Sequence, residues 1–425
     1  MDLQHLYQLY LKHPSIQTDT RKLKNGDLFM ALKGPNFNAN AFAEEAFAKG
    51  AAFAIIDDKK FEVPGRTILV EDVLTTLQAL ALHHRKQFNI PVIAITGSNG
   101  KTTTKELIHA VLCSSFKTYT TEGNLNNHIG IPLTILKTRN DAEFVIIEMG
   151  ANHQKEIEGY CKYVLPTHGL ITNCGKAHLE GFGGTEGVKK GKGELFDYLR
   201  TEKGKAFVMW DHEYLQAMSK GISEIIKYGS KDADYEGQVT QHDPFLEMEV
   251  TKGLLIDSIK TNLVGNYNFS NVLAAVTIGA YFNVPPAKIK AAIENYFPTN
   301  SRSQLLEKDG NHIILDAYNA NPSSMKAAIE NFASMEVENK ILILGAMAEL
   351  GEETEQEHEA LIELIKKYSW KEVVLVGKHF SKNNHRFNYF ENADQAKKWF
   401  ADQRLENAYI LIKGSRSSAM EKVIT

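Results

Sequence analysis

The sequence predicts an α/β protein of three domains, and two observations support this. The chain has 425 residues, which is too long for one ordinary domain. Short apolar runs alternate with helix-forming stretches along most of the chain, as expected for parallel sheets covered by helices on both faces. We place a small α/β domain at residues 1–88, a central domain with a mostly parallel sheet at residues 89–298, and a Rossmann-like α/β domain at residues 299–425.

The composition is that of an ordinary globular protein, with 43% hydrophobic residues, 24% charged residues and a net charge of -4. The weak negative charge argues against a nucleic-acid partner. Without a membrane-spanning apolar run or a signal-peptide-like start, we expect a cytoplasmic protein with no membrane insertion. Cys113, Cys161 and Cys174 are widely spaced, which favours buried thiols over disulfides or a zinc site.

In the first domain, strands are expected at residues 27–32, 51–56 and 67–70, with helices at residues 41–49 and 73–88. Two polar loops could hold a diphosphate through an arginine and a lysine, and Phe37 could stack on a base. Ordinary solvated loop charges are the alternative. The candidate residues are Thr18, Asp19, Thr20, Arg21 and Lys33.

Continuous apolar runs predict the strands of the two larger domains. In the central domain they lie at residues 92–96, 144–149, 169–172, 206–209 and 224–228. Alternating residues then predict an antiparallel appendage at 235–264, and a helix follows at 268–282. In the last domain the strands lie at residues 312–315, 341–344, 373–376 and 409–412, without the G-x-G-x-x-G signature.

The strand at residues 92–96 runs directly into a glycine loop and then into helix-forming sequence. Gly97 and Gly100 allow several backbone N–H groups to point at one anion, at the positive end of the following helix. Because Ile95 replaces the first glycine of G-x-x-x-x-G-K-[ST], this is a shortened phosphate loop. Its phosphate-binding residues are Gly97, Ser98, Asn99, Gly100, Lys101, Thr102 and Thr103, with the Thr102 hydroxyl available to Mg2+.

Two further residues lie where a parallel sheet binds ligands, and a lysine follows them in the sequence. Glu148 ends a buried strand and is suited to Mg2+, and His178 follows the next strand on a glycine-bordered loop. Lys192 lies in a lysine-rich stretch. Its ammonium group could counter phosphate charge. Alternatively, the neutral amine could take up CO2 to become a carbamate that binds Mg2+, and the residue type does not decide between these two roles.

Carboxamides gather in two other segments. Their donors and acceptors suit sugar, peptide or pyrophosphate groups, and turn formation is the alternative. The residues are Asn124, Asn126 and Asn127 in the central domain, and Asn319 and Asn321 beside Asp316 in the last domain.

Together these motifs resemble the Mur ligase family, most specifically its MurF branch. The loop at residues 96–103 is shared with folylpolyglutamate synthetases. The more specific segments are residues 123–132, 148–153, 177–183, 318–322 and 413–416. The chain departs from the family pattern at two places: Ala346 replaces the aspartate of Gly-Asp-Met-x-Glu-Leu-Gly, and residues 38–40 read Asn-Ala-Asn where Asp-Gly-His is frequent.

The resemblance implies an ATP-dependent ligase that joins D-alanyl-D-alanine to UDP-N-acetylmuramoyl-tripeptide through an acyl phosphate. The three domains would bind the uridine nucleotide, ATP, and the dipeptide with part of the ATP, in that order. The implied catalytic residues are Lys101, His178 and Lys192; the Mg2+ ligands are Thr102, Glu148, His178 and carbamylated Lys192; and further ATP contacts are Asn271, Arg302 and Asp316.

Small-molecule substrates are the only partners expected, and we expect a monomer. Two alternatives stay open at this stage: a related ligase that adds glutamate to folate or to a polymer, and a catalytically silent nucleotide-binding scaffold. The first domain argues against the former. The joint presence of Lys101, Glu148, His178 and Lys192 argues against the latter.

Overall fold

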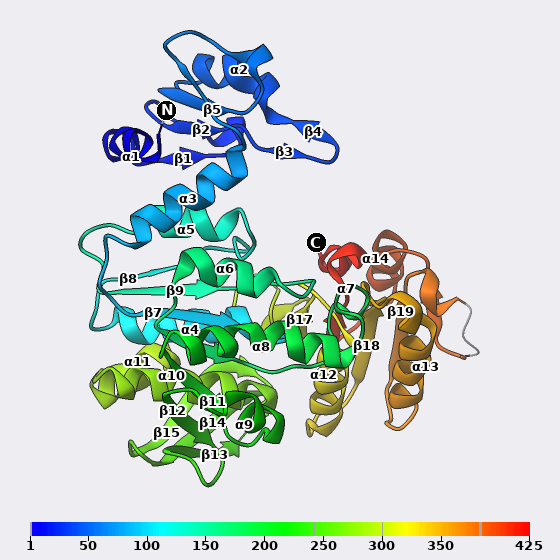
Figure 1. Cartoon of the computed structure of the whole chain (residues 1–425). Coiled ribbons are helices and arrows are strands. Elements are labelled where there is room, and N and C mark those ends of the chain that lie inside the picture. The colour runs from blue at the N-terminus through cyan, green and yellow to red at the C-terminus, as the bar shows by residue number, and fades with distance from the viewer. Residues whose placement is uncertain (1, 242, 300, 382–384) are drawn as a thin grey trace. The chain divides into compact units, whose positions relative to one another are not determined.

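The computed structural model describes residues 2–241, 243–299, 301–381 and 385–425 (Figure 1). They form two compact units. The first comprises residues up to 95 together with residues 116–151 and 156–169, and the second comprises residues 96–115, 152–155 and 170–425. Both units combine helices with mostly parallel strands, which confirms the predicted fold class.

The N-terminal part of the first unit is built on a four-stranded parallel sheet in the order β1-β2-β5-β6. Its strands are β1 (Ile16–Gln17), β2 (Leu28–Met30), β5 (Phe53–Ile56) and β6 (Thr67–Leu69). A short antiparallel hairpin of β3 (Lys33–Gly34) and β4 (Phe37–Asn38) projects beside it (Figure 1). The apolar core between this sheet and α2 (Ala43–Ala48) contains Phe29, Ala46 and Ile56.

Helix α3 (Val73–Arg85) has Asp72 as its N-cap and buries Leu77 and Leu80. It contacts α1 (Leu3–Lys12), α5 (Gly130–Lys137) and α6 (Glu156–Val164). The remaining strands of this unit pair in parallel in the order β7-β9-β8, and they are β7 (Val92–Thr96), β9 (Phe144–Glu148) and β8 (Thr118–Thr120).

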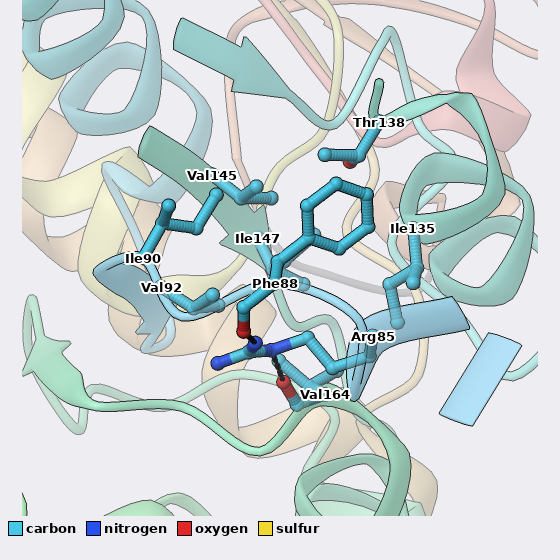
Figure 2. A pocket seen from close by; sticks show the side chains of 9 residues that line it. All are labelled: Arg85, Phe88, Ile90, Val92, Ile135, Thr138, Val145, Ile147 and Val164. Atoms are coloured by element: carbon cyan, nitrogen blue, oxygen red, sulfur yellow. Dashed lines mark hydrogen bonds between the residues drawn. The ribbon is translucent and has the colours of Figure 1, made fainter. Parts of the chain in front are cut away.

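A small apolar cavity of about 10 Å³ lies in the core of the first unit (Figure 2). The buried Arg85 guanidinium lies at its edge and donates from Nε to the Val164 carbonyl at 2.9 Å and from Nη1 to the Phe88 carbonyl at 2.8 Å. Thr138 also lines the cavity, and none of the described residues forms a hydrogen bond with its buried hydroxyl. None of the residues that we expected to bind ligand lines this cavity, so we regard it as a packing defect.

The second unit begins with α4 (Lys101–Cys113), and its first sheet has the strand order β10-β11-β12-β13-β14-β15. The strands are β10 (His168–Ile171), β11 (Lys205–Met209), β12 (Glu224–Gly229), β13 (Tyr235–Gln241), β14 (Phe245–Lys252) and β15 (Ile256–Val264). The last three pair antiparallel, as predicted. The helices are α7 (Leu179–Phe182), α8 (Thr185–Thr201), α9 (Glu213–Ser219), α10 (Phe269–Tyr281) and α11 (Pro286–Glu294).

The C-terminal part of the second unit is a six-stranded sheet in the order β16-β17-β21-β18-β19-β20, parallel except for β16. The strands are β16 (Gln304–Lys308), β17 (Asn311–Asp316), β18 (Lys340–Gly345), β19 (Glu372–Val376), β20 (Asn388–Phe390) and β21 (Tyr409–Lys413). Helices α12 (Pro322–Ser334) and α13 (Thr354–Ile365) pack together, and α14 (Ala393–Asp402) contacts β19 and β20 (Figure 1). Ile343, Val374 and Ile410 lie in its core.

The structure adds one helix that was not predicted and corrects the prediction for the cysteines. Helix α1 was not expected, although Asp2 caps it and Leu6, Tyr7 and Tyr10 form its buried face. The prediction that all three cysteines are buried is correct for Cys161 only: Cys174 is half-buried, and Cys113 is exposed at the C-terminal end of α4, since only one face of that helix is covered. No helix of the described residues combines the length and apolar character needed to span a membrane.

Candidate functional site

The glycine loop has the backbone geometry that phosphate binding requires. Gly97 has a φ of 142°, and a Cβ there would lie 2.0 Å from Thr172 Oγ1. Gly100, the N-cap of α4, has a φ of 79°, and a Cβ there would lie 2.6 Å from Asn271 Oδ1. Both positions therefore need glycine for conformation and for space, and the loop leads into the N-terminus of a 13-residue helix.

Two residues after β10 hold this loop, and we had not singled either of them out from the sequence. The Ser98 N–H donates to the Asn173 carbonyl at 2.9 Å, and the Asn99 N–H donates to Asn173 Oδ1 at 3.1 Å. Thr172 Oγ1 donates to the Asn99 carbonyl at 2.6 Å. Because the donors and acceptors of the loop backbone are paired in this way, its shape is set before any ligand binds.

Lys101 folds back over its own loop. Its Nζ donates to the Gly97 carbonyl at 2.6 Å and to the Ser98 carbonyl at 3.2 Å. Thr102 is buried and Thr103 is half-buried on the same first turn of α4. A phosphate at the helix N-terminus would therefore meet a cation that is already held at the loop.

The loop is also tied to the C-terminal part of the same unit. Asn321 caps α12, and its Nδ2 donates to Asn99 Oδ1 at 2.7 Å. The Lys176 N–H donates to Ser323 Oγ at 2.8 Å, and Lys176 Nζ pairs with the buried Glu357 carboxylate. The structure thus brings together two segments that we had expected to serve different ligands.

The expected ATP contacts outside the loop have partners of their own. The buried Asn271 carboxamide accepts from Thr104 Oγ1 at 3.0 Å and donates to Asn268 Oδ1 at 2.9 Å. The Arg302 guanidinium lies 3.5 Å from the centre of the Tyr318 ring. At the end of β17, Asp316 pairs with the buried Lys413 ammonium at 2.5 Å, and Asn319 Oδ1 accepts from the Ala320 N–H at 2.9 Å.

His178 and Lys192 differ in their surroundings. His178 has a left-handed backbone and lies at the start of α7, where its Nδ1 is 2.5 Å from Glu349 Oε2. This contact lowers the pKa of the Glu349 carboxyl. Lys192, on α8, is only 1% exposed, and its Nζ lies 4.8 Å from the centre of the Phe182 ring. Burial of a lysine favours its neutral form, which is the form that reacts with CO2.

In the first unit, the two oxygens of the buried Glu148 carboxylate differ in their hydrogen bonding. Its Oε1 accepts from Asn126 Nδ2 at 2.7 Å, whereas Oε2 is buried and has no hydrogen-bond partner among the residues that the structure describes. Asn127 instead caps α5, because its Oδ1 accepts from the N–H groups of Ile129 and Gly130. The side chain of Asn124 is exposed.

The loops expected to bind a diphosphate contain paired side chains. Arg21 forms a bidentate pair with Asp19, which lowers the pKa of that carboxyl to about 2. Thr20 Oγ1 donates to Glu45 at 3.0 Å, and Thr18 is half-buried.

Lys33 pairs with the buried Asp57 carboxylate at 2.8 Å. Asn40, which is fully buried, donates to Asp57 Oδ1 at 2.8 Å and accepts from the Asp57 N–H at 2.9 Å. Burial alone would raise the pKa of the Asp57 carboxyl, but the bonds from Lys33 and Asn40 outweigh it and lower the pKa. The departure at residues 38–40 thus gives this chain an internal support for its β3 lysine.

No cluster of three or more His, Cys, Asp or Glu side chains that could hold a metal ion occurs among the described residues. A Mg2+ site would therefore depend on other oxygen ligands in addition, such as a threonine hydroxyl or a lysine carbamate. The unpartnered Oε2 of Glu148 fits such a cation, because a buried carboxylate oxygen without a donor is costly.

Comparison with known proteins identifies the family. A model described as the Mur ligase middle domain matches residues 95–279, and one described as Mur ligase, glutamate ligase domain matches residues 301–416. The UDP-N-acetylmuramoyl-tripeptide--D-alanyl-D-alanine ligase of Bacillus subtilis (strain 168) is 34% identical over 426 residues, which cover 96% of this chain and 92% of that protein. The ligase of the same name from Escherichia coli (strain K12) is 35% identical over 425 residues, with the same coverage.

Solved structures agree over almost the whole chain. MurF from Acinetobacter baumannii has a TM-score of 0.89 and 28% identity, covering 99% of this chain and 97% of that one. MurF ligase from Thermotoga maritima in complex with ADP has a TM-score of 0.86 and 26% identity, covering 97% of each chain. This chain therefore belongs to the Mur ligase family and, within it, to the MurF type.

Proposed function

We propose that this chain is an ATP-dependent ligase that forms the amide bond between UDP-N-acetylmuramoyl-tripeptide and D-alanyl-D-alanine in peptidoglycan precursor synthesis. The observation that supports this most directly is the match over 96% of the chain to ligases with that name. The preformed phosphate loop before α4 is what an enzyme of this kind needs for ATP. A folylpolyglutamate synthase from Thermotoga maritima is only 13% identical and covers 82% of this chain. This similarity supports a common fold and no common function.

The chemistry follows from the loop. The substrate carboxylate attacks the γ-phosphorus of ATP, ADP leaves, and an acyl phosphate remains. Lys101 and the N–H groups of the first turn of α4 stabilise the negative charge that develops on the transferring oxygens. The dipeptide amine then attacks the activated carbonyl, loses a proton, and inorganic phosphate departs. Closure about Pro298 would exclude the water that otherwise hydrolyses the acyl phosphate.

Mg2+ is part of this proposal. The ion would be held by Thr102 and Glu148, and a second one by His178 and carbamylated Lys192, where each would neutralise charge on phosphate oxygens. The orphaned Glu148 Oε2 supports the first pair. The burial of Lys192 supports carbamate formation.

We assign the substrates to three parts of the chain. Residues 1–88 would bind the uridine nucleotide through Thr18, Asp19, Thr20, Arg21 and Lys33. Residues 89–298 would bind ATP, with Asn124, Asn126 and Asn127 near the growing peptide. Residues 299–425 would bind the dipeptide through Asn319 and Asn321, with Arg302 and Asp316 near ATP. Because ATP and a nucleotide-linked precursor are its substrates, we place the enzyme in the cytoplasm, and we expect it to act as a monomer.

Phosphate release by the purified protein with ATP, Mg2+ and D-alanyl-D-alanine tests this proposal. We expect release only when UDP-N-acetylmuramoyl-tripeptide is also present, together with a pentapeptide product identified by mass spectrometry. Lys101→Ala should abolish the reaction while leaving the circular dichroism spectrum unchanged. ATP binding without turnover of these substrates would contradict the proposal and favour a different substrate or a silent scaffold.

A further inference from the structure

We propose that Glu349 is a positioning residue that acts through His178: its carboxylate fixes the imidazole with the proton on Nδ1 and the lone pair on Nε2. The inference rests on the proposed function, because His178 is a cation ligand only there. The motif at residues 345–351 was singled out in the sequence for Ala346, whereas the structure points to the glutamate three residues later.

The contact between the two side chains is specific. Nδ1 of His178 is buried and lies 2.5 Å from Glu349 Oε2, in ion-pair contact without the alignment of a hydrogen bond, and no other group of the described residues forms a hydrogen bond with it. A carboxylate beside one ring nitrogen favours the tautomer that carries its proton there. Nε2 is then the nitrogen whose lone pair is available to a cation, as in metal sites where a carboxylate orients the ligating histidine.

Both partners are held in an unusual backbone conformation. His178 has a φ of 52° and Glu349 has a φ of 61°, so both lie in the left-handed region that residues with a Cβ seldom adopt. Neither position is glycine or asparagine, the residue types that adopt this conformation most readily. Strain of this kind persists where the side chain is needed, and here it brings the two side chains together.

The loop that carries Glu349 has its own supports. The buried His358 accepts from the Met347 N–H at 3.1 Å and donates from Nδ1 to the Thr354 carbonyl at 2.7 Å. The Glu180 N–H donates to the Glu349 carbonyl at 3.3 Å. These contacts do not involve the Glu349 carboxylate, so truncation of that side chain should leave the loop in place.

The contact also joins the two family segments within the second unit. His178 belongs to the segment matched by the middle-domain model, and Glu349 belongs to the segment matched by the second model. The C-terminal segment thereby contributes to the orientation of a side chain in the central one. Helix α7 also contacts η5 (Gly351–Glu353), the short 3-10 helix that follows Glu349.

The first test reads the tautomer directly. In full-length protein labelled with 15N-histidine at about pH 8, the His178 ring signals are identified by their loss in His178→Asn. We expect wild type to show a protonated Nδ1 and an unprotonated Nε2, and Glu349→Ala to lose this pattern. Glu352→Ala is the matched control, because Glu352 is an exposed glutamate in the following turn. An unchanged pattern in Glu349→Ala would overturn the proposal.

The second test measures Mn2+ binding by electron paramagnetic resonance in the presence of ADP. We expect a 10- to 100-fold weaker affinity in Glu349→Ala, the usual effect of losing a residue that orients a metal ligand. Glu349→Gln, which keeps an acceptor oxygen, should fall between Glu349→Ala and wild type, and it replaces the alanine variant if that protein does not fold. Normal affinity in His178→Asn would refute the proposed metal role of His178. Weak binding in His178→Asn but not in Glu349→Ala would refute only the role of Glu349.

Discussion

Asn126 pairs with only one oxygen of the Glu148 carboxylate: its Nδ2 donates to Oε1 at 2.7 Å, and Oε2 is buried with no donor in the described part of the chain. The asparagine is fixed in turn, because the Gly150 N–H donates to its carbonyl at 2.8 Å, and a Cβ at Gly150 would lie 2.9 Å from its side chain. Asn126 therefore orients the carboxylate, in addition to the substrate contact that we propose for it.

Replacement of this asparagine should weaken Mg2+ or Mn2+ binding. In Asn126→Ala the Glu148 carboxylate loses its one partner and its fixed orientation, so we expect a 10- to 100-fold loss of Mn2+ affinity. The unfolding free energy should fall by about 1–3 kcal/mol, because a buried acceptor is left unpaired. Titration calorimetry and urea unfolding measure the two effects. Asn124→Ala, in the same loop but exposed, should change neither, and equal effects in both variants would contradict the assignment.

Gly100→Ala should distort the phosphate loop as well as lower the stability of the protein through its backbone conformation. The φ of 79° alone costs about 1–2 kcal/mol for a residue with a Cβ, and this Cβ would also strike Asn271 Oδ1 at 2.6 Å. Gly310 is a matched control with a φ of 73° and no atom near its added Cβ. We expect Gly310→Ala to lose stability but keep ADP affinity, whereas Gly100→Ala loses both. Equal ADP affinity in the two variants would show that the contact with Asn271 does not shape the loop.

The sequence predicted the buried strands well because their apolar runs are continuous and end at the ligand-binding edge. β7 begins and ends where we expected, and the antiparallel segment β13–β15 was recognised from its alternation. Helix α1 was missed although its signal was present, since Asp2 and the spacing of Leu6, Tyr7 and Tyr10 mark a capped amphipathic helix.

The candidate site residues could be chosen from local residue types, whereas the contacts that support them could not be predicted. The need for Gly97 and Gly100 follows from local chemistry and is seen in their positive φ. Asn99 pairs with Asn321, and His178 pairs with Glu349. In each pair the two residues lie far apart along the chain. A single sequence does not reveal such pairs, because they form only when the fold brings the loops of two sheets together.

Acidification should loosen the packing of α1 on α3 through His84. This imidazole is buried, accepts from the Tyr7 hydroxyl at 3.0 Å through Nδ1 and donates from Nε2 to the Thr138 carbonyl at 2.9 Å. Burial lowers its pKa below the usual value of about 6.5. The unfolded chain therefore binds a proton more readily than the folded one, so this contribution is present above about pH 6.5 and is lost as the pH falls toward the lowered pKa.

Amide hydrogen exchange in α1 and α3 between pH 5.5 and 8 measures this effect. Protection in wild type should fall at low pH more steeply than in His84→Gln, which cannot take up the proton. His128→Gln provides the control, because His128 is exposed, lies outside both helices and should leave the slope unchanged. The same slope in all three proteins would exclude His84 as its source.

Thr138→Val should stabilise the first unit. The Thr138 hydroxyl lies beside the apolar cavity in Figure 2 and has no hydrogen-bond partner within the described ranges, so the folded state is destabilised by its lost hydration. Valine has nearly the same shape, and its substitution should raise the unfolding free energy by about 1 kcal/mol. The Thr138 carbonyl, which accepts from His84, belongs to the backbone and is retained in the variant.

Thr134 is the matched control position, since its hydroxyl donates to the Gly130 carbonyl at 3.0 Å, and Thr134→Val should be neutral or destabilising. If urea unfolding gave both variants the same sign of change, side-chain hydrogen bonding would not be what distinguishes the two threonines.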